Sequence, residues 1–101
     1  MRRSELEIHI DILKALARHG PLKVTHITYK ANVNSSLLKL YLVFQVQHNL
    51  VEEQTLHKKG TKAIGVYAIT EKGRIVLKRF RKVIVALKGS EEANKIPPLL
   101  Y

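Results

Sequence analysis

Residues 50–69, LVEEQTLHKKGTKAIGVYAI, decide the fold because the hydrophobic pattern of the chain changes its period there. Residues 63–69 are rich in β-branched and aromatic side chains, which favour a strand, and residues 50–57 predict a second strand despite three consecutive polar residues. Between them, residues 57–62 (HKKGTK) contain one glycine and three lysines and predict a hairpin loop. The sequence therefore predicts a two-stranded hairpin with a strongly basic tip.

Three helices are predicted before this hairpin. Ser4 and Glu7 form a capping-box pattern that opens a helix over residues 4–19, and the Gly-Pro pair after it ends that helix. A short helix is expected at about residues 23–30. A third helix is expected over residues 34–48, because Asn and Ser are favoured at helix N-termini. The Ala-Asn-Val-Asn segment between these two helices predicts a tight turn, since Asn tolerates left-handed backbone angles.

A fourth helix is predicted after the hairpin. Thr70 caps it, residues 71–88 form it, and a Gly-Ser pair is expected to end it. The order of elements predicts an α+β fold, a winged helix-turn-helix with a three-helix core, a two-stranded wing and a C-terminal fourth helix used for dimerisation. We assign residues 1–88 to this DNA-binding domain and residues 89–101 to a short apolar tail.

The composition excludes several classes of protein. The 101 residues include no Cys, which removes disulfides, thiol chemistry and cysteine-ligated metal sites. No run approaches the roughly 18 apolar residues of a membrane span, and the N-terminal segment carries carboxylates where a signal peptide needs an apolar stretch. The histidines have no metal-cage spacing, and the glycines form no phosphate-binding loop. We expect a cytoplasmic, nucleoid-associated protein that is not an enzyme and has no catalytic residue, cofactor, metal, membrane or small-molecule partner.

The positive charge is concentrated in one third of the chain. The formal net charge is +10, and residues 57–88 hold ten basic residues against Glu71 alone, a net of +9. A surface built this way has one positive face, which is typical of a polyanion partner. Double-stranded DNA is the leading candidate.

The start of the third helix and the basic loop are the predicted DNA contacts. In a helix-turn-helix, the N-terminal residues of the recognition helix lie near base edges in the major groove, and wing lysines reach a backbone or a minor groove. Alternatively, Asn34 and Ser35 only cap the helix, and the lysines only keep the loop soluble. Arg2 and Arg3 could add a phosphate contact from an N-terminal arm. The candidate DNA-binding residues are Lys30, Asn34, Ser35, Ser36, Lys39, Lys58, Lys59 and Lys62.

The fourth helix carries too many apolar residues for one stripe. Two sets at alternating spacings of three and four describe seams of the coiled-coil type, so one face would cover the core and the other would need a partner. A second subunit is the expected partner, because twofold dimers dominate small oligomers. The alternative is that the apolar residues of the tail fold back over this face. The candidate dimer-interface residues are Val76, Phe80, Val83, Ile84 and Leu87.

The segment Ile69–Gly73 (ITEKG), followed by Leu77 and Phe80, is similar to archaeal winged-helix proteins. With the other matching segments, the chain resembles the small basic DNA-binding family often called the ten-a chromatin proteins. The resemblance implies a dimer formed through an antiparallel coiled coil of the last helix, binding duplex DNA with limited sequence preference. The other matches, within a similarity that covers residues 3–82, are Ser4–Ile8, Gly20–Lys23, Thr25–Asn32 and Tyr41-Leu42.

Three positions depart from the pattern of that family. Gln45 stands where an apolar core residue is usual, Val43 where a polar or acidic one is usual, and Asn49 replaces a Gly. The helix predicted to stop at Gly89 is also short for a long coiled coil. Val43 and Leu40 make the exposed side of the third helix apolar.

Two functional hypotheses follow. The first is a dimeric winged-helix protein that binds double-stranded DNA, as a chromatin component or as a transcriptional regulator. The alternative is a protein-binding winged helix of the transcription machinery that uses the apolar side of its third helix. The wing lysines favour the first, and an enzyme is a distant third possibility.

Overall fold

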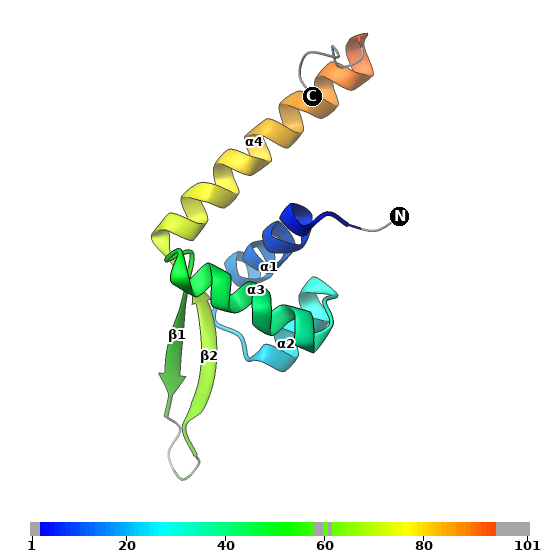
Figure 1. Ribbon diagram of the computed structural model, residues 1–101. Helices are drawn as coiled ribbons and strands as arrows, with labels where there is room; N and C mark the ends of the chain where they lie inside the picture. The colour runs from blue at the N-terminus through cyan, green and yellow to red at the C-terminus, as the bar shows by residue number, and fades with distance from the viewer. Residues whose placement is uncertain (1–2, 58–59, 61, 95–101) are drawn as a thin grey trace.

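The computed structural model describes residues 3–57, 60 and 62–94. Its helices and strands confirm the predicted winged helix-turn-helix (Figure 1). The first five elements agree with the predicted ranges to within one residue at each end. The elements are α1 (Glu5–His19), α2 (Val24–Ala31), α3 (Ser35–Gln47), β1 (Val51–Leu56), β2 (Ile64–Ile69) and α4 (Glu71–Asn94).

The predicted caps position the helices. At α1, the Ser4 hydroxyl accepts from the Glu7 amide at 3.1 Å and the Glu7 carboxylate accepts from the Ser4 amide at 3.2 Å, so the capping box is complete. At α4, the Thr70 hydroxyl accepts from the Gly73 amide at 3.0 Å. Each cap pairs an otherwise unpaired amide of a first helical turn.

Two asparagines make the sharp turns before and after α3. Asn32 has a φ of 54° and ends α2, and Asn49 has a φ of 61° just after α3. Asn adopts this left-handed region more readily than most residues. The predicted tight turn between α2 and α3 is therefore confirmed.

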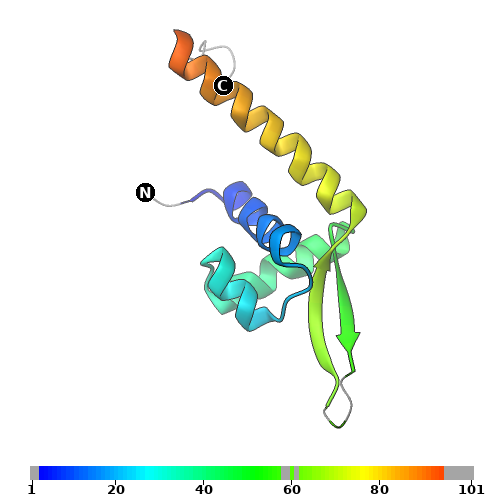
Figure 2. The ribbon, with the colours of Figure 1, turned by 180° about the vertical axis from the view of Figure 1, so that it is seen from behind.

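The fourth helix is longer than predicted. It continues through Gly89 and Ser90 to Asn94, so the predicted end at Lys88 was wrong. A glycine inside a helix costs only about 1 kcal/mol relative to alanine, and here good helix formers follow it. Figures 1 and 2 show α4 projecting away from the rest of the molecule, on the side opposite the hairpin.

The hairpin is joined to the helical body by a contact that the sequence did not predict. Strands β1 and β2 pair antiparallel, with Val51 opposite Ile69 and Leu56 opposite Ile64. Leu22, in the loop between α1 and α2, adds two backbone hydrogen bonds to Tyr67 of β2, at 2.8 and 3.0 Å. This pairing fixes the wing relative to the helix-turn-helix.

The core lies where α1, α2 and α3 meet the base of the hairpin and the start of α4. Its side chains include Ile12, Leu16, Ile27 and Leu38, all fully buried. In α1, Ile10, Leu13 and Leu16 are buried. Leu6 is 56% exposed, because it lies at the free end of α1 beyond the packed core.

Gly73 sets the position of α4 against the body. A Cβ built on this glycine would lie 2.2 Å from the backbone oxygen of Leu50 and 2.8 Å from a side-chain carbon of Ile69. Only a residue without a side chain allows the first turn of α4 to approach that backbone so closely. The same Leu50 oxygen accepts from the Thr70 amide at 3.0 Å, so the junction is held from both sides.

Candidate nucleic-acid interface

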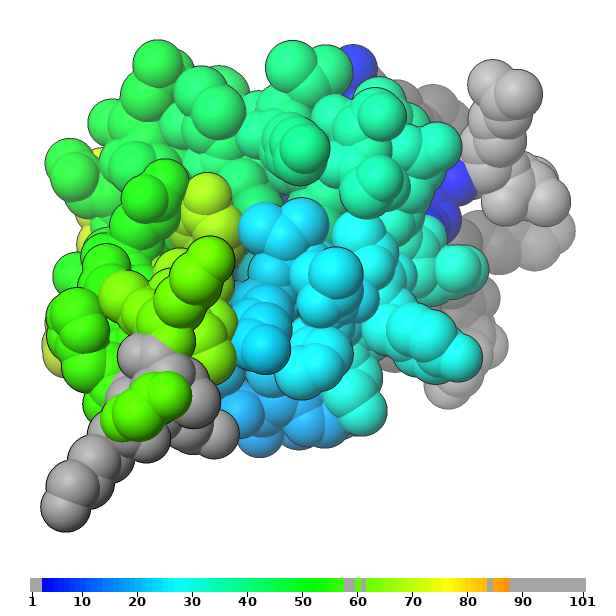
Figure 3. Space-filling view, turned by 90° about the horizontal axis from the view of Figure 1, so that it is seen from below, coloured from blue at the N-terminus to red at the C-terminus, as the bar shows by residue number. Residues whose placement is uncertain are grey.

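The predicted DNA-binding elements share one face of the molecule. Seen from below, α2, the start of α3 and the hairpin form one continuous surface (Figure 3). The rise of α4 on the opposite side keeps it clear of that surface (Figure 1). The fold thus brings together residues that are up to 32 positions apart, from Lys30 to Lys62.

The start of α3 combines exposed polar groups with a capped helix N-terminus. Ser35, Ser36 and Lys39 are exposed. Asn34 caps the helix, because its side-chain oxygen accepts from the Ser36 amide at 2.8 Å and from the Leu37 amide at 3.4 Å. The first turn holds no acidic residue, so the positive end of the helix dipole is open to an anion. The capping role of Asn34 is therefore shown, and its side-chain amide nitrogen is left to donate to DNA.

The end of α2 adds a cation and an aromatic ring. Lys30 lies in the last turn and is exposed. Its neighbour Tyr29 is 90% exposed, and the sequence prediction missed it as a candidate contact. The signal was present, because at 100° per residue Tyr29 points almost directly away from the inward-facing Ile27 and Ala31.

The wing places its positive charge apart from its acids. Lys62 and His57 are exposed near the tip, whereas Lys58 and Lys59 lie outside the described residues. Glu52 and Glu53 sit near the base of β1, four or more residues from the tip, which is about 13 Å along a strand. At that base the Tyr67 hydroxyl donates to a Glu53 oxygen at 3.1 Å. Burial, together with this hydrogen bond, raises the pKa of Tyr67.

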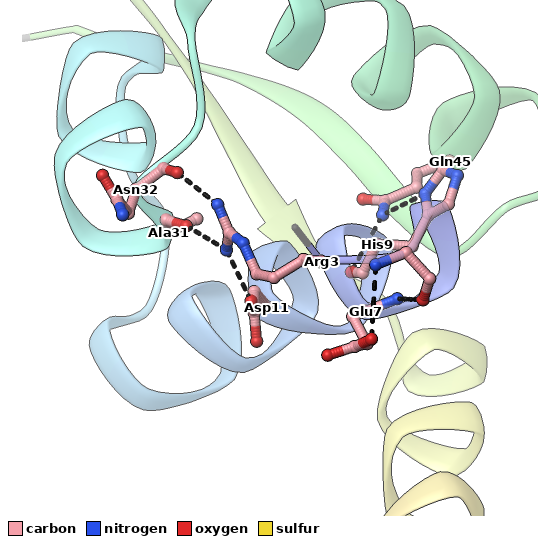
Figure 4. A network of polar contacts seen from close by, with 8 residues as sticks. Arg3, Glu7, His9, Asp11, Ala31, Asn32 and Gln45 are labelled. Carbon is pink, nitrogen blue, oxygen red and sulfur yellow. Dashed lines mark hydrogen bonds and ion pairs between the residues drawn. The ribbon is translucent and has the colours of Figure 1, made fainter. Parts of the chain in front are cut away.

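Arg3 has a different role from the predicted arm. Its guanidinium pairs with Asp11 at 2.6 Å and donates to the carbonyl of Ala31 at 2.8 Å and to that of Asn32 (Figure 4). These bonds tie the segment before α1 to the end of α2. Arg3 therefore does not lie on a free arm, because three acceptors hold its guanidinium. Its contact with DNA stays a prediction, and Arg2 lies outside the described residues.

Gln45 is the departure from the family pattern that the structure explains. Its side chain is fully buried, and its amide nitrogen lies 3.0 Å from Nδ1 of His9 and 3.2 Å from the His9 carbonyl (Figure 4). The His9 ring also packs edge-on against Tyr41, with ring centres 4.5 Å apart. Burial lowers the pKa of His9, and nearby Glu5 partly opposes that shift. A polar pair thus joins α1 to α3 at a place where the family pattern has an apolar residue at position 45.

The predicted dimer-interface residues lie along α4, which leaves the body. Val76, Phe80 and Leu87 are half-buried, and Val83 is 54% exposed. The side chain of Ile84 lies outside the described residues. Leu77, the neighbour of Val76, is buried in the core of its own chain. The candidate residues Val76, Phe80, Val83 and Leu87 form a stripe along α4 that is not fully buried.

The polar remainder of α4 is basic. Its exposed cations, among the side chains that the structure describes, are Lys72, Arg74, Lys78, Arg79, Arg81 and Lys82. No helix among the described residues is long and apolar enough to cross a membrane.

Solved structures confirm the fold. A PadR family transcription regulator from Clostridium difficile is 15% identical, with a TM-score of 0.74 over 84% of this chain and 94% of that chain. A PadR-like transcriptional regulator from Bacillus cereus is 16% identical, with a TM-score of 0.71 over 88% of this chain and 93% of that one. Sso10a-2, a DNA-binding protein from Sulfolobus solfataricus, is 26% identical, with a TM-score of 0.66 over 89% of this chain and 90% of that chain.

The sequence comparisons agree with the structural ones. No curated protein matches the chain. The sequence pattern described as winged helix-turn-helix matches residues 2–88. The chain therefore belongs to the winged helix-turn-helix family and has the fold of DNA-binding transcription regulators.

Proposed function

We propose that this protein binds double-stranded DNA through α2, the start of α3 and the wing, and that it does so as a dimer. The observation that carries the proposal is the single face on which Lys30, Lys39 and Lys62 are exposed beside the acid-free N-terminus of α3. Such a face offers cations for phosphates and small polar groups for base edges.

The proposed dimer forms through α4. Along the stripe from Val76 to Leu87, on a helix that projects from the body, Val83 is exposed and the other three side chains are half-buried. Pairing two such helices would bury these side chains and join two DNA-binding faces in one particle. Two linked faces raise the affinity for one duplex above that of either face alone.

The finer assignment is to a chromatin-type protein of the ten-a kind rather than to a gene-specific regulator. The resemblance of the ITEKG segment supports it, as does the similarity to a DNA-binding protein of Sulfolobus solfataricus. The protein is proposed to be a binding module without enzymatic activity. A nuclease footprint on genomic DNA separates the two roles, because a chromatin protein protects many unrelated sites and a regulator protects few.

Fluorescence anisotropy with a labelled duplex, repeated at several salt concentrations, tests DNA binding. We expect the logarithm of the association constant to fall linearly with the logarithm of salt concentration, by about 0.9 for each phosphate contacted. Binding that salt does not change, or no binding at low salt, would contradict the proposal. Sedimentation of the protein alone tests the dimer, and a monomer at tens of micromolar would contradict it.

A second candidate function is protein binding through the apolar side of α3. Leu40 is 69% exposed and Val43 is 56% exposed. A helix that only reads DNA does not need this much exposed apolar surface. Retention of an RNA polymerase subunit or an initiation factor by the protein, combined with a failure to bind duplex DNA, would select this reading.

A further inference from the structure

An apolar groove runs between α1, α3 and the start of α4. It has a volume of about 580 Å³, and most of its lining is apolar. Large side chains remain open to solvent along it, with Leu40 69% and Leu6 56% exposed. Its other lining residues include Leu37, Phe44, Leu50 and Val76.

The groove adjoins the proposed DNA-binding face and extends away from it. One position is about 100° of rotation on an α-helix, so the groove residue Leu37 points away from the exposed Ser36 and Lys39. Leu40 follows Ser36 by four positions and lies at the edge between the two surfaces. DNA bound at the start of α3 would therefore leave the part of the groove around Leu37 uncovered.

An antiparallel pair of α4 helices would bring the partner's C-terminal end to this groove. The stripe from Val76 to Leu87 is centred near position 81. With the crossing there, position 94 of one helix lies level with about position 69 of the other, at the start of its α4. Leu50 and Val76 line the groove at that level.

The segment after Asn94 has a matching composition. Residues 95–101 read KIPPLLY, with Ile96, Leu99, Leu100 and Tyr101 as its apolar side chains. A Pro-Pro pair favours an extended polyproline conformation and lowers the entropy lost on docking.

The same segment cannot fill its own groove. Asn94 lies 18 residues beyond Val76, which is about 27 Å along the helix. Tyr101 follows Asn94 by seven residues, whose backbone reaches about 24 Å when fully extended. Even a straight return along α4 therefore leaves the backbone of the segment short of Val76, and at most the ring of Tyr101 reaches the near edge of the groove.

We propose that residues 96–101 of the partner subunit fill this apolar groove, so that each protomer seals the other. The inference rests on the proposed α4 dimer. It also accounts for the apolar side of α3, which the partner's segment would cover.

Disulfide trapping tests the exchange directly, since the chain has no Cys of its own. In the double variant Leu40→Cys with Leu99→Cys, mild oxidation should give a covalent dimer on a non-reducing gel. A matched control joins Leu99→Cys to Tyr29→Cys, whose side chain is 90% exposed on α2, and should give no covalent dimer.

Each other outcome counts against the exchange. A disulfide within one chain, no disulfide, or equal trapping in the control would overturn it. Sedimentation of the same samples separates the two proposals: a dimer without specific trapping refutes only the exchange, whereas a monomer refutes the proposed dimer and the exchange with it.

Equilibrium dimerisation gives a second readout with the full chain. Leu40→Ser and the pair Leu99→Ser/Leu100→Ser should each raise the dimer dissociation constant at least about tenfold, and combining them should add little, because both remove one contact. Leu40 is exposed in the protomer, so its replacement spares folding. Unchanged dissociation constants, or fully additive effects, would contradict the exchange.

Discussion

The two exposed sides of α3 have opposite chemistry although they belong to one helix. One side carries Ser36 and Lys39 at the face shared with α2 and the wing. The other carries Leu37, Leu40 and Phe44 in the groove against α1 and α4. The mean directions of the two sets differ by roughly 100° of rotation about the helix axis, which separates a surface suited to DNA from one suited to protein. The predictions below act on one side at a time.

The largest expected effect comes from Gly73→Ala, which disturbs the junction behind both sides. The added carbon would lie 2.2 Å from the Leu50 oxygen, so α4 must shift. Overpacking against backbone typically costs about 1–3 kcal/mol, and we expect at least the upper end. Urea unfolding measures the loss. Gly65→Ala is the matched control, because no atom lies within 4 Å of its Cβ position. Equal losses in the two variants would show that close packing of Gly73 against Leu50 is not the cause.

The next effect belongs to the protein-binding side. Val83→Glu places a charge in the middle of the proposed α4 stripe, where it would be buried without a partner. We expect the dimer dissociation constant to rise at least about 100-fold, or about 2.7 kcal/mol, with the stability of the protomer unchanged. Sedimentation equilibrium measures it. Lys82→Ala, on an exposed neighbouring position, should leave the dimer intact, and a dimeric Val83→Glu variant would remove this stripe from the interface.

A smaller effect distinguishes a structural cation from a DNA-binding one. Arg3→Ala removes the ion pair to Asp11 and the bonds to the end of α2, so we expect a loss of about 1–2 kcal/mol in unfolding free energy. The affinity of the folded Arg3→Ala variant for DNA should not change. Lys39→Ala should do the reverse, weakening DNA binding and sparing stability. If Arg3→Ala alters the salt dependence of binding, the arm contacts DNA after all.

The smallest effect is a pH dependence at the wall of the groove. Burial lowers the pKa of His9 in the folded state, so below the ordinary value of 6.5 the unfolded chain binds a proton that the folded chain resists. Stability should therefore fall as pH drops from 6.5 toward the lowered pKa. Thermal unfolding from pH 7.5 to 5.5 measures this, with His9→Gln as comparison. An equal fall in that variant would assign the pH dependence to other groups.

Local signals predicted most of the fold. Ser4 with Glu7, Asn34 and Thr70 each act through residues two or three positions away, so their capping roles were legible in the sequence. The predicted end of α4 was wrong because a Gly-Ser pair ends a helix only where the glycine takes a non-helical conformation. In α4 the backbone stays helical through this pair.

Features that depend on distant residues escaped prediction. Arg3 meets carbonyls 28 and 29 positions away, and Gln45 meets His9 across 36 positions. The groove forms only where α1, α3 and the start of α4 come together in the folded chain. The cationic candidates could be named from charge and order alone, but the exposure of Tyr29 needed the helical wheel of α2 as well.

The salt dependence of DNA binding by one triple variant tests the central claim most directly. Lys30→Ala, Lys39→Ala and Lys62→Ala together should flatten the slope by about 0.9 for each lysine that contacts a phosphate in each bound protomer. Lys82→Ala, on the projecting α4, should leave it unchanged. An unaltered slope in the triple variant, or an equal change in the control, would contradict the assignment of DNA to this face.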